Sequence, residues 1–104
     1  MGLLQRLGEH PGAPETIELG ASTLVGRRPP CDVQIDESSL TRQHAIVAWR
    51  RDHWEILDLE SLNGTRVNGR RLARGEAARL EVGSEVVFGQ MPVWCLVSDA
   101  PPEW

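Results

Sequence analysis

Three polar segments hold most of the side chains that could do chemistry. The first segment contains Gly26, Arg27 and Arg28, the second contains Ser38, Ser39, Thr41 and Arg42, and the third contains Ser61, Asn63 and Thr65. Together they offer guanidinium forks, hydroxyl groups and loop N–H groups, which are the donors that bind oxyanions such as phosphate. They contain no acidic pair and no nucleophile with an adjacent base. The sequence therefore predicts a site that holds an anion rather than one that breaks a bond.

A hydrolytic triad is the first alternative, because Ser61, His44 and Asp58 are residue types that cleave esters and amides. The sequence around Ser61 lacks the Gly-x-Ser-x-Gly pattern that exposes a nucleophile on a sharp turn between a strand and a helix. Asp58 also stands at the end of an apolar run, where a carboxylate can accept hydrogen bonds from loop amides. We therefore expect that the protein is not an enzyme.

A metal site would have to draw on scattered histidines and cysteines, namely His10, Cys31, His44, His53 and Cys95. No two of them are close neighbours in the sequence, and the cysteines match neither a zinc nor a Cys-x-x-Cys spacing. We therefore expect no metal ion and no cofactor. The two cysteines fit reduced thiols in a cytoplasmic protein, while a single disulfide stays an open alternative.

Composition narrows the location and the partners. No stretch approaches the roughly 18 apolar residues that cross a membrane, and the start MGLLQRLGEH lacks the apolar part of a signal peptide. We expect a cytoplasmic protein with no membrane partner. The net charge of −4 argues against a nucleic-acid partner, because nucleic-acid binding requires a basic surface.

The arginines are concentrated in the part of the chain that holds the three polar segments. Residues 26–74 carry nine arginines against seven acidic residues, and the chain has no lysine. The functional interpretation is phosphate recognition, because the guanidinium fork suits planar oxyanions. The alternative interpretation is codon bias towards arginine.

The elements that must position the polar segments are short strands. Apolar runs recur at intervals of about ten residues, with Gly, Pro, Asn and Asp between them. The expected strands are LLQRL, TIEL, STLVG, DVQI, HAIVAWR, HWEILDL, TRV, EVVFG and VWCLVS. Alternating apolar side chains in HAIVAWR and HWEILDL are typical of strands with one face on a core, and Arg51-Asp52 between them predicts a tight hairpin. ARGEAARLEVG is nearest to a helical pattern but is too short to predict a helix.

A chain of 104 residues with many short strands predicts one all-β sandwich. Loops at one end of a sandwich gather in space, so the three polar segments can converge there. We expect Trp49, Trp54 and Trp94 to fill positions in the core or on a sheet face.

The order of the motifs resembles the forkhead-associated (FHA) domain family. Gly26-Arg27 is followed by Thr41-Arg42-Gln43-His44, then by Asp58 and Ser61-Leu62-Asn63-Gly64-Thr65, and finally by Val67-Asn68-Gly69. CDVQID, WEILDLES and LEVGSEVVFG also look like strands of that family, so the resemblance covers about residues 15–97. It implies an eleven-stranded β-sandwich of two antiparallel or mixed sheets, FHA/SMAD-like, with binding loops at one end. We expect the domain to span residues 1–98, and residues 99–104 to form a C-terminal tail or linker.

The resemblance implies a phosphothreonine-dependent binding module in Ser/Thr kinase signalling. Arg27, Thr41 and Arg42 would hold the phosphate, and Asn63 would bind the backbone of the partner peptide. The residues expected to hold the loops in shape are Gly26, His44, Ser61, Gly64, Thr65 and Asn68. The expected partner is a phosphothreonine-containing protein, a Ser/Thr kinase or its substrate, and the expected state is a monomer. The alternative from another class is a scaffold with the same fold that binds partners without phosphate, through a sheet face or edge.

Thr41 departs from the family pattern, which usually has Ser at this position. Thr keeps the hydroxyl donor, so phosphate binding is expected to survive. Its extra methyl group stiffens the side chain and adds bulk inside a crowded loop. Leu62 offers no hydroxyl group to the site, at a position where the family tolerates variety.

Two Asn-Gly pairs stand close together in DLESLNGTRVNG. Asn-Gly favours two-residue hairpin turns, and two such turns here would leave a strand of only about three residues between them. We interpret Asn63-Gly64 as a ligand-facing loop and Asn68-Gly69 as the hairpin turn that reverses TRV into RRL. Asn63 is thus expected to serve binding, and Asn68 mainly stability.

Overall fold

The computed structural model describes residues 1–103 and contains eleven strands, with no helix among those residues. The strands are β1 (Gly2–Arg6), β2 (Thr16–Leu19), β3 (Ser22–Gly26), β4 (Val33–Gln34), β5 (Ala45–Arg50), β6 (His53–Asp58), β7 (Thr65–Val67), β8 (Arg70–Arg71), β9 (Ala77–Leu80), β10 (Glu85–Phe88) and β11 (Trp94–Asp99). No helix in this part of the chain is long and apolar enough to span a bilayer.

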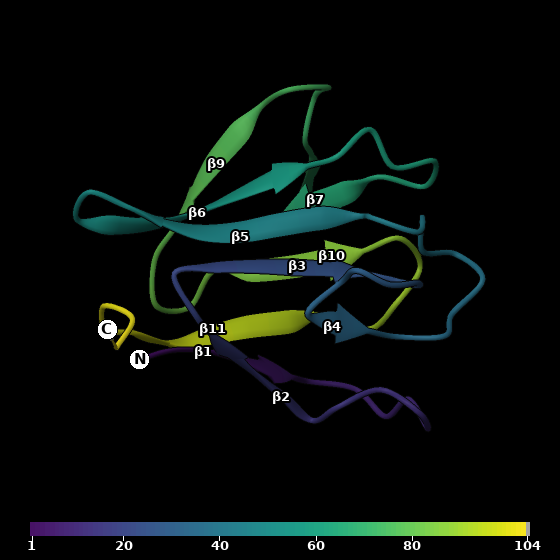
Figure 1. Ribbon diagram of the computed structural model, residues 1–104, viewed down its shortest axis with the longest axis horizontal. Helices are drawn as coiled ribbons and strands as arrows, with labels where there is room; N and C mark the ends of the chain where they lie inside the picture. The colour runs from purple at the N-terminus through teal and green to yellow at the C-terminus, as the bar shows by residue number, and fades with distance from the viewer. Residues whose placement is uncertain (104) are drawn as a thin grey trace.

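The strands form two sheets that pack as a sandwich (Figure 1). The six-stranded sheet has the order β2-β1-β11-β10-β7-β8, and the five-stranded sheet has the order β4-β3-β5-β6-β9. All pairings are antiparallel except that of β3 with β4, which is parallel. The expected all-β sandwich of two antiparallel or mixed sheets is therefore confirmed.

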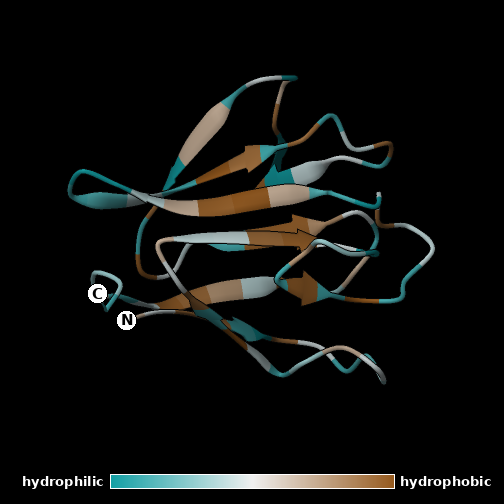
Figure 2. Ribbon diagram, in the orientation of Figure 1, coloured by the Kyte–Doolittle hydropathy of each residue, from teal (hydrophilic) through white to brown (hydrophobic). Residues whose placement is uncertain are grey.

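The core lies between the sheets and is built from alternate residues of each strand, as strand geometry requires. In β6, Trp54, Ile56 and Asp58 point inward, and their neighbours are half-buried. Brown apolar segments run along β5, β10 and β11, and the turn between β5 and β6 is teal (Figure 2). The tryptophan expectation holds: Trp54 and Trp94 are fully buried, and Trp49 is half-buried with its ring 5.3 Å from that of Trp54 in an edge-on arrangement.

Two segments differ from the expected strands. DVQI forms a strand only at Val33–Gln34, and the unexpected β9 comes from the stretch with the nearest helical pattern. Pairing decides the conformation of β9, because Leu80 stands opposite Trp54 and is buried in the core. Local preference was a poor guide there, since tertiary contacts override it in short segments.

The C-terminal residues stay attached to the sandwich up to the end of the described chain. β11 ends at Asp99, and the indole Nε1 of Trp54 donates to the carbonyls of Asp99 and Ala100, each at 3.2 Å. Pro102 is buried. The boundary at residue 98 stays a prediction, and Trp104 lies outside the described residues.

The second Asn-Gly pair forms the turn between β7 and β8. Asn68 has a φ of 51° and Gly69 a φ of 83°, which is the left-handed pair that a tight hairpin turn of this kind requires. The Asn68 side chain also accepts a hydrogen bond from the N–H of Glu85 at 2.9 Å, and its own N–H donates to the Glu85 carbonyl at 2.8 Å. Asn68 therefore fixes the hairpin and ties it to the start of β10, while Val67 packs inward.

Replacing Asn68 with Ala should lower the free energy of unfolding by about 1–2 kcal/mol, because Ala tolerates positive φ poorly and removes the bond to Glu85. Urea denaturation of the wild type and the variant measures this loss. An Asn68→Ala protein that kept its full stability would contradict this role of Asn68 in the turn.

Candidate functional site

The three polar segments meet at one end of the sandwich. The loops after β3, before β5 and between β6 and β7 lie on the right of Figure 1, opposite the β5–β6 hairpin and both termini. They enclose a cavity of about 230 Å³. Its lining residues are Arg27, Ser38, Ser39, Leu40, Thr41, Arg42, Leu62 and Asn63. The four residues expected to bind the ligand, Arg27, Thr41, Arg42 and Asn63, are therefore brought together.

His44 joins two of these loops from beneath. The Thr41 N–H donates to His44 Nδ1 at 3.0 Å, so Nδ1 carries no proton, and Nε2–H donates to the Gly64 carbonyl at 2.8 Å. The ring is fully buried, and this burial lowers the pKa of His44, although the Gly64 carbonyl and the nearby Asp58 act in the opposite direction. His44 is thus a neutral connector whose two nitrogens both hold backbone groups.

Asp58 shapes the loop between β6 and β7 from its buried position at the end of β6. It accepts hydrogen bonds from the Ser61 N–H at 3.0 Å, from the Ser61 hydroxyl, and from the Thr65 hydroxyl at 2.7 Å. Ser61, His44 and Asp58 therefore do not form a triad, because Ser61 donates to Asp58 and both nitrogens of His44 are already engaged. Ser61 and Thr65 lie where residues that brace a loop would lie.

Two further hydrogen bonds connect the loops at the cavity itself. The Leu62 N–H donates to the Thr41 hydroxyl oxygen at 2.9 Å. The Asn63 side-chain amide donates to the Ser39 carbonyl at 2.9 Å, which fixes the orientation of that amide. The hydroxyl proton of Thr41 and the side-chain oxygen of Asn63 make no hydrogen bond within residues 1–103, so both stay available to a ligand.

Two glycines allow the loops to approach closely. A Cβ at Gly26 would collide with the Arg42 carbonyl and lie 2.7 Å from the Cys31 sulfur. Gly64 has a φ of 84°, and a Cβ there would collide with the guanidinium of Arg71. The expected scaffold positions of Gly26 and Gly64 are therefore sites where a side chain does not fit.

The cavity contains cations without counterions. The Nε of Arg27 is buried and has no hydrogen-bond partner among residues 1–103, although buried donors are normally paired. Arg42 is exposed, and within the described chain neither its guanidinium nor its backbone N–H donates a hydrogen bond. By contrast, the neighbouring Arg28 pairs with Asp36 at 3.2 Å. The lining thus presents positive charge and free donors, which is the equipment for holding an anion.

The sequence did not single out the support that comes from the loop after β10. The Ser39 hydroxyl accepts the N–H of Gln90 at 3.0 Å, and a Cβ at Gly89 would lie 2.7 Å from the Ser39 carbonyl. Gly89 also has a positive φ of 58°. A glycine directly after a strand was the available signal. Arg71 does not line the cavity but lies beside these loops, because the folded β7–β8 hairpin places it against Gly64.

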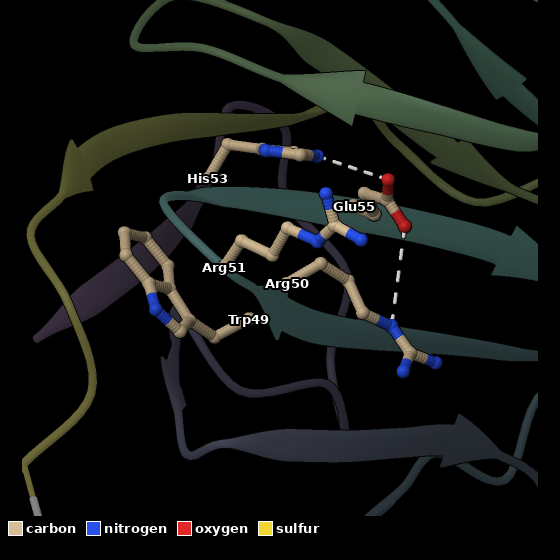
Figure 3. A pocket seen from close by; sticks show the side chains of 5 residues that line it. All are labelled: Trp49, Arg50, Arg51, His53 and Glu55. Atoms are coloured by element: carbon tan, nitrogen blue, oxygen red, sulfur yellow. Dashed lines mark hydrogen bonds and ion pairs between the residues drawn. The ribbon is translucent and has the colours of Figure 1, made fainter.

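A larger cavity, of about 570 Å³, lies at the other end of the sandwich, beside the β5–β6 hairpin (Figure 3). It is lined by Trp49, Arg50, Arg51, His53 and Glu55. Glu55 contacts both His53, at 2.9 Å, and Arg50, at 3.9 Å, whereas Arg51 has no carboxylate partner within residues 1–103. We place the candidate site at the smaller cavity, because the three polar segments converge there and neither Arg27 nor Arg42 has a carboxylate partner in the described chain.

No group of three or more His, Cys, Asp or Glu side chains in residues 1–103 is arranged to hold a metal ion. Cys31 and Cys95 are both free thiols. Burial raises the pKa of Cys31, and its sulfur donates to the Arg42 carbonyl at 3.0 Å. Cys31 thereby supports the loop that carries Arg42.

The buried neutral state of His44 predicts a stability that depends on pH. Because its pKa in the folded protein is below the ordinary value of about 6.5, the unfolded chain binds more protons as the pH falls below 6.5, and stability declines. Thermal unfolding between pH 7.5 and 5.5 should show this decline in the wild type and a weaker one in His44→Gln.

His53 offers the matched control, because Asp52 and Glu55 raise its pKa. Its stabilising contribution is present at low pH and is lost as the pH rises through that raised pKa, so His53→Gln should not weaken the decline. Equal pH slopes for the wild type and His44→Gln would refute the role given to His44.

Comparison with known proteins identifies relatives of this chain. The model of the FHA domain family matches residues 23–89. An oxoglutarate dehydrogenase inhibitor from Corynebacterium efficiens is 33 % identical over 79 residues, which are 76 % of this chain and 54 % of that protein. This chain thus spans about half the length of that curated relative.

Solved structures show the same fold. The FHA domain of the CT664 protein from Chlamydia trachomatis is 30 % identical, with a TM-score of 0.76 over 95 % of this chain and 98 % of that one. EmbR from Mycobacterium tuberculosis, solved in complex with a low-affinity phosphopeptide, is 22 % identical, with a TM-score of 0.80 over 99 % of this chain and 26 % of that one. Since the family model matches more than half of the sequence, the chain belongs to the forkhead-associated (FHA) domain family.

Proposed function

We propose that the loops around Arg27 bind phosphothreonine in a segment of a partner protein. The observation that carries this proposal is that Arg27 lines a cavity together with Thr41 and Arg42, while its buried Nε has no hydrogen-bond partner within residues 1–103. An unpaired buried donor costs about 1–3 kcal/mol, and a bound oxyanion offsets that cost. The solved phosphopeptide complex of EmbR, which shares the fold, supports a ligand of this class.

Each free group of the cavity has a place in this proposal. Thr41 accepts the Leu62 N–H and so keeps its own hydroxyl proton for the phosphate. Arg42 supplies its backbone N–H and its exposed guanidinium. Asn63 holds the Ser39 carbonyl with its amide and offers its oxygen to an N–H of the peptide backbone. Thr in place of the usual Ser therefore leaves the donor intact.

The magnitudes are adequate for a regulated interaction. A phosphothreonine carries roughly −1.5 to −2 charges and three acceptor oxygens. Charge-assisted hydrogen bonds contribute about 1.5–3 kcal/mol each, so two or three of them suffice for moderate affinity over a small contact. A preference over phosphoserine requires burial of the single methyl group, worth about 1–3 kcal/mol in a fitted pocket.

The proposal extends to the setting of the domain. We expect a binding module rather than an enzyme, because the donors hold an anion and the only Ser–Asp contact of the loops is a structural one. Two free cysteines fit a reducing, cytoplasmic location. The partner is expected to be a Ser/Thr kinase or a kinase substrate, and the domain a monomer. A phospho-independent scaffold has no need for uncompensated arginines at the loops.

Titration with three peptides of one sequence tests the proposal. The peptides carry phosphothreonine, phosphoserine or unmodified threonine at the central position, and calorimetry measures each dissociation constant. We expect the phosphothreonine peptide to bind most tightly and the unmodified peptide to bind at least about a hundredfold more weakly, since two charge-assisted bonds are lost. Equal affinities for the phosphorylated and unmodified peptides would favour the scaffold alternative.

Replacing Arg27 with Ala should weaken phosphothreonine-peptide binding by more than about tenfold while the domain stays folded. The adjacent Arg28→Ala is the matched control, because Arg28 is exposed and already paired with Asp36. Fluorescence titration of both variants measures the difference. If Arg27→Ala bound the peptide as well as Arg28→Ala does, Arg27 would have no part in the site.

A further inference from the structure

Some arginines of residues 26–74 form ion pairs with carboxylates, and others do not. Four exposed arginines pair with carboxylates, in the pairs Arg28–Asp36, Arg50–Glu55, Arg70–Glu76 and Arg74–Glu60. Within residues 1–103, Arg71 has no carboxylate partner, although its neighbour Arg70 forms a two-pronged pair with Glu76. The Arg70 contact lowers the pKa of Glu76 to about 2. Arg70 is therefore neutralised, and Arg71 is a free cation.

Arg71 lies directly against the binding loop. The turn at Asn68-Gly69 reverses the chain, so that β8 returns to the loop between β6 and β7. The Arg71 guanidinium donates to the Leu62 carbonyl at 3.3 Å and covers Gly64 so closely that a Cβ there would collide with it. Leu62 and its neighbour Asn63 both line the phosphate cavity. Arg71 therefore borders the cavity on the Asn63 side.

A second cation stands next to Arg71. Arg66 of β7 is its direct cross-strand partner, and Arg66 has no carboxylate partner in the described chain either. Like charges directly opposite each other on a sheet destabilise it. A negatively charged group placed between them would relieve that repulsion. The pair thus supports the same inference as the free guanidinium on the loop.

We propose that Arg71, with Arg66 beside it, forms a second anion subsite that selects phosphothreonine peptides with another negative group near the phosphothreonine. This inference rests on the proposed function of the cavity. The group is a carboxylate or a second phosphate, since both fit a guanidinium fork. An extended peptide advances about 3.3 Å per residue, so the second group stands within a few residues of the phosphothreonine, on the side that passes over Gly64.

Leu62 gives the subsite an apolar border. Leu62 is 83 % exposed and lines the cavity, and its carbonyl accepts the hydrogen bond from Arg71.

Four phosphothreonine peptides test the proposal by calorimetry at one salt concentration. One has neutral flanks, one has glutamates at the three preceding positions, one has glutamates at the three following positions, and one has a phosphoserine on the side that glutamate favours. The wild type should bind one glutamate peptide about three- to fivefold more tightly than the neutral peptide, as a partly exposed ion pair allows. The doubly phosphorylated peptide separates a phosphate from a carboxylate as the preferred group.

The variants assign any gain to Arg71. Arg71→Gln should remove the gain and leave binding of the neutral peptide within about twofold, whereas Arg71→Lys should keep part of it because the charge remains. Arg51→Gln is the charge-matched control, since it removes another exposed positive charge, in the β5–β6 hairpin at the end of the sandwich opposite the binding loops (Figure 1). It should keep the whole gain.

The outcomes separate this inference from the proposed function. If the wild type binds the neutral peptide but gains nothing from either glutamate peptide, the subsite is refuted and the phosphothreonine site stands. A gain that persists in Arg71→Gln, or one that Arg51→Gln abolishes equally, also refutes it. If no phosphothreonine peptide binds, both proposals fail. Should Arg71→Gln not fold, the Arg71→Lys variant and the wild-type comparison decide.

Discussion

The binding end of this domain depends on one buried side chain. His44 holds the backbone of Thr41 with one nitrogen and that of Gly64 with the other, so a single ring sets the spacing between two loops that are distant in sequence. The ring packs edge-on against Phe88, with the two centroids 6.2 Å apart, which ties this connection to the core. Because both partners are backbone groups, the loop geometry depends little on the side chains that the loops display. The site can thus be rigid while its specificity varies.

Charged groups also divide into those that hold the structure together and those that face the cavity. Four exposed arginines pair with carboxylates, and Asp58 is buried beneath the loops, where hydroxyl and N–H groups of Ser61 and Thr65 satisfy it. Within residues 1–103, neither Arg27 nor Arg42, which line the cavity, has a carboxylate partner. Desolvated or half-buried guanidinium groups are costly when unpaired, and functional sites are where such costs are usually found. The free cations are therefore informative in a chain whose net charge is negative.

Much of the fold followed from alternation and turn residues. We could predict β5, β6 and the hairpin at Asn68-Gly69 from the sequence, because the local preferences there agree with the strand pairing of the folded protein. β9 was not readable, since AARL has no β-branched or aromatic residue and becomes a strand only because β6 presents an edge to it. DVQI was expected to be longer than β4, whose two residues pair in parallel with the end of β3.

The site was partly predictable. The sequence indicated which three segments would converge, and the structure places them around one cavity. It could not indicate the hydrogen bond from the Leu62 N–H to the Thr41 hydroxyl or the one from the Asn63 amide to the Ser39 carbonyl. Both bonds depend on the relative position of loops that are distant in sequence, which no local pattern encodes. The placement of Arg71 over Gly64 depends on the same three-dimensional detail. The roles of these residues in ligand binding stay predictions.

The most direct test of the central claim is an NMR titration of the ¹⁵N-labelled domain with a phosphothreonine peptide. We expect that the Arg27 side-chain Nε–H signal and the backbone signals of Thr41, Arg42 and Asn63 shift together, with one saturation curve. We expect little change at the β5–β6 hairpin, which lines the larger cavity. Shifts confined to that hairpin or to a sheet face, with an unmoved Arg27 signal, would contradict this expectation.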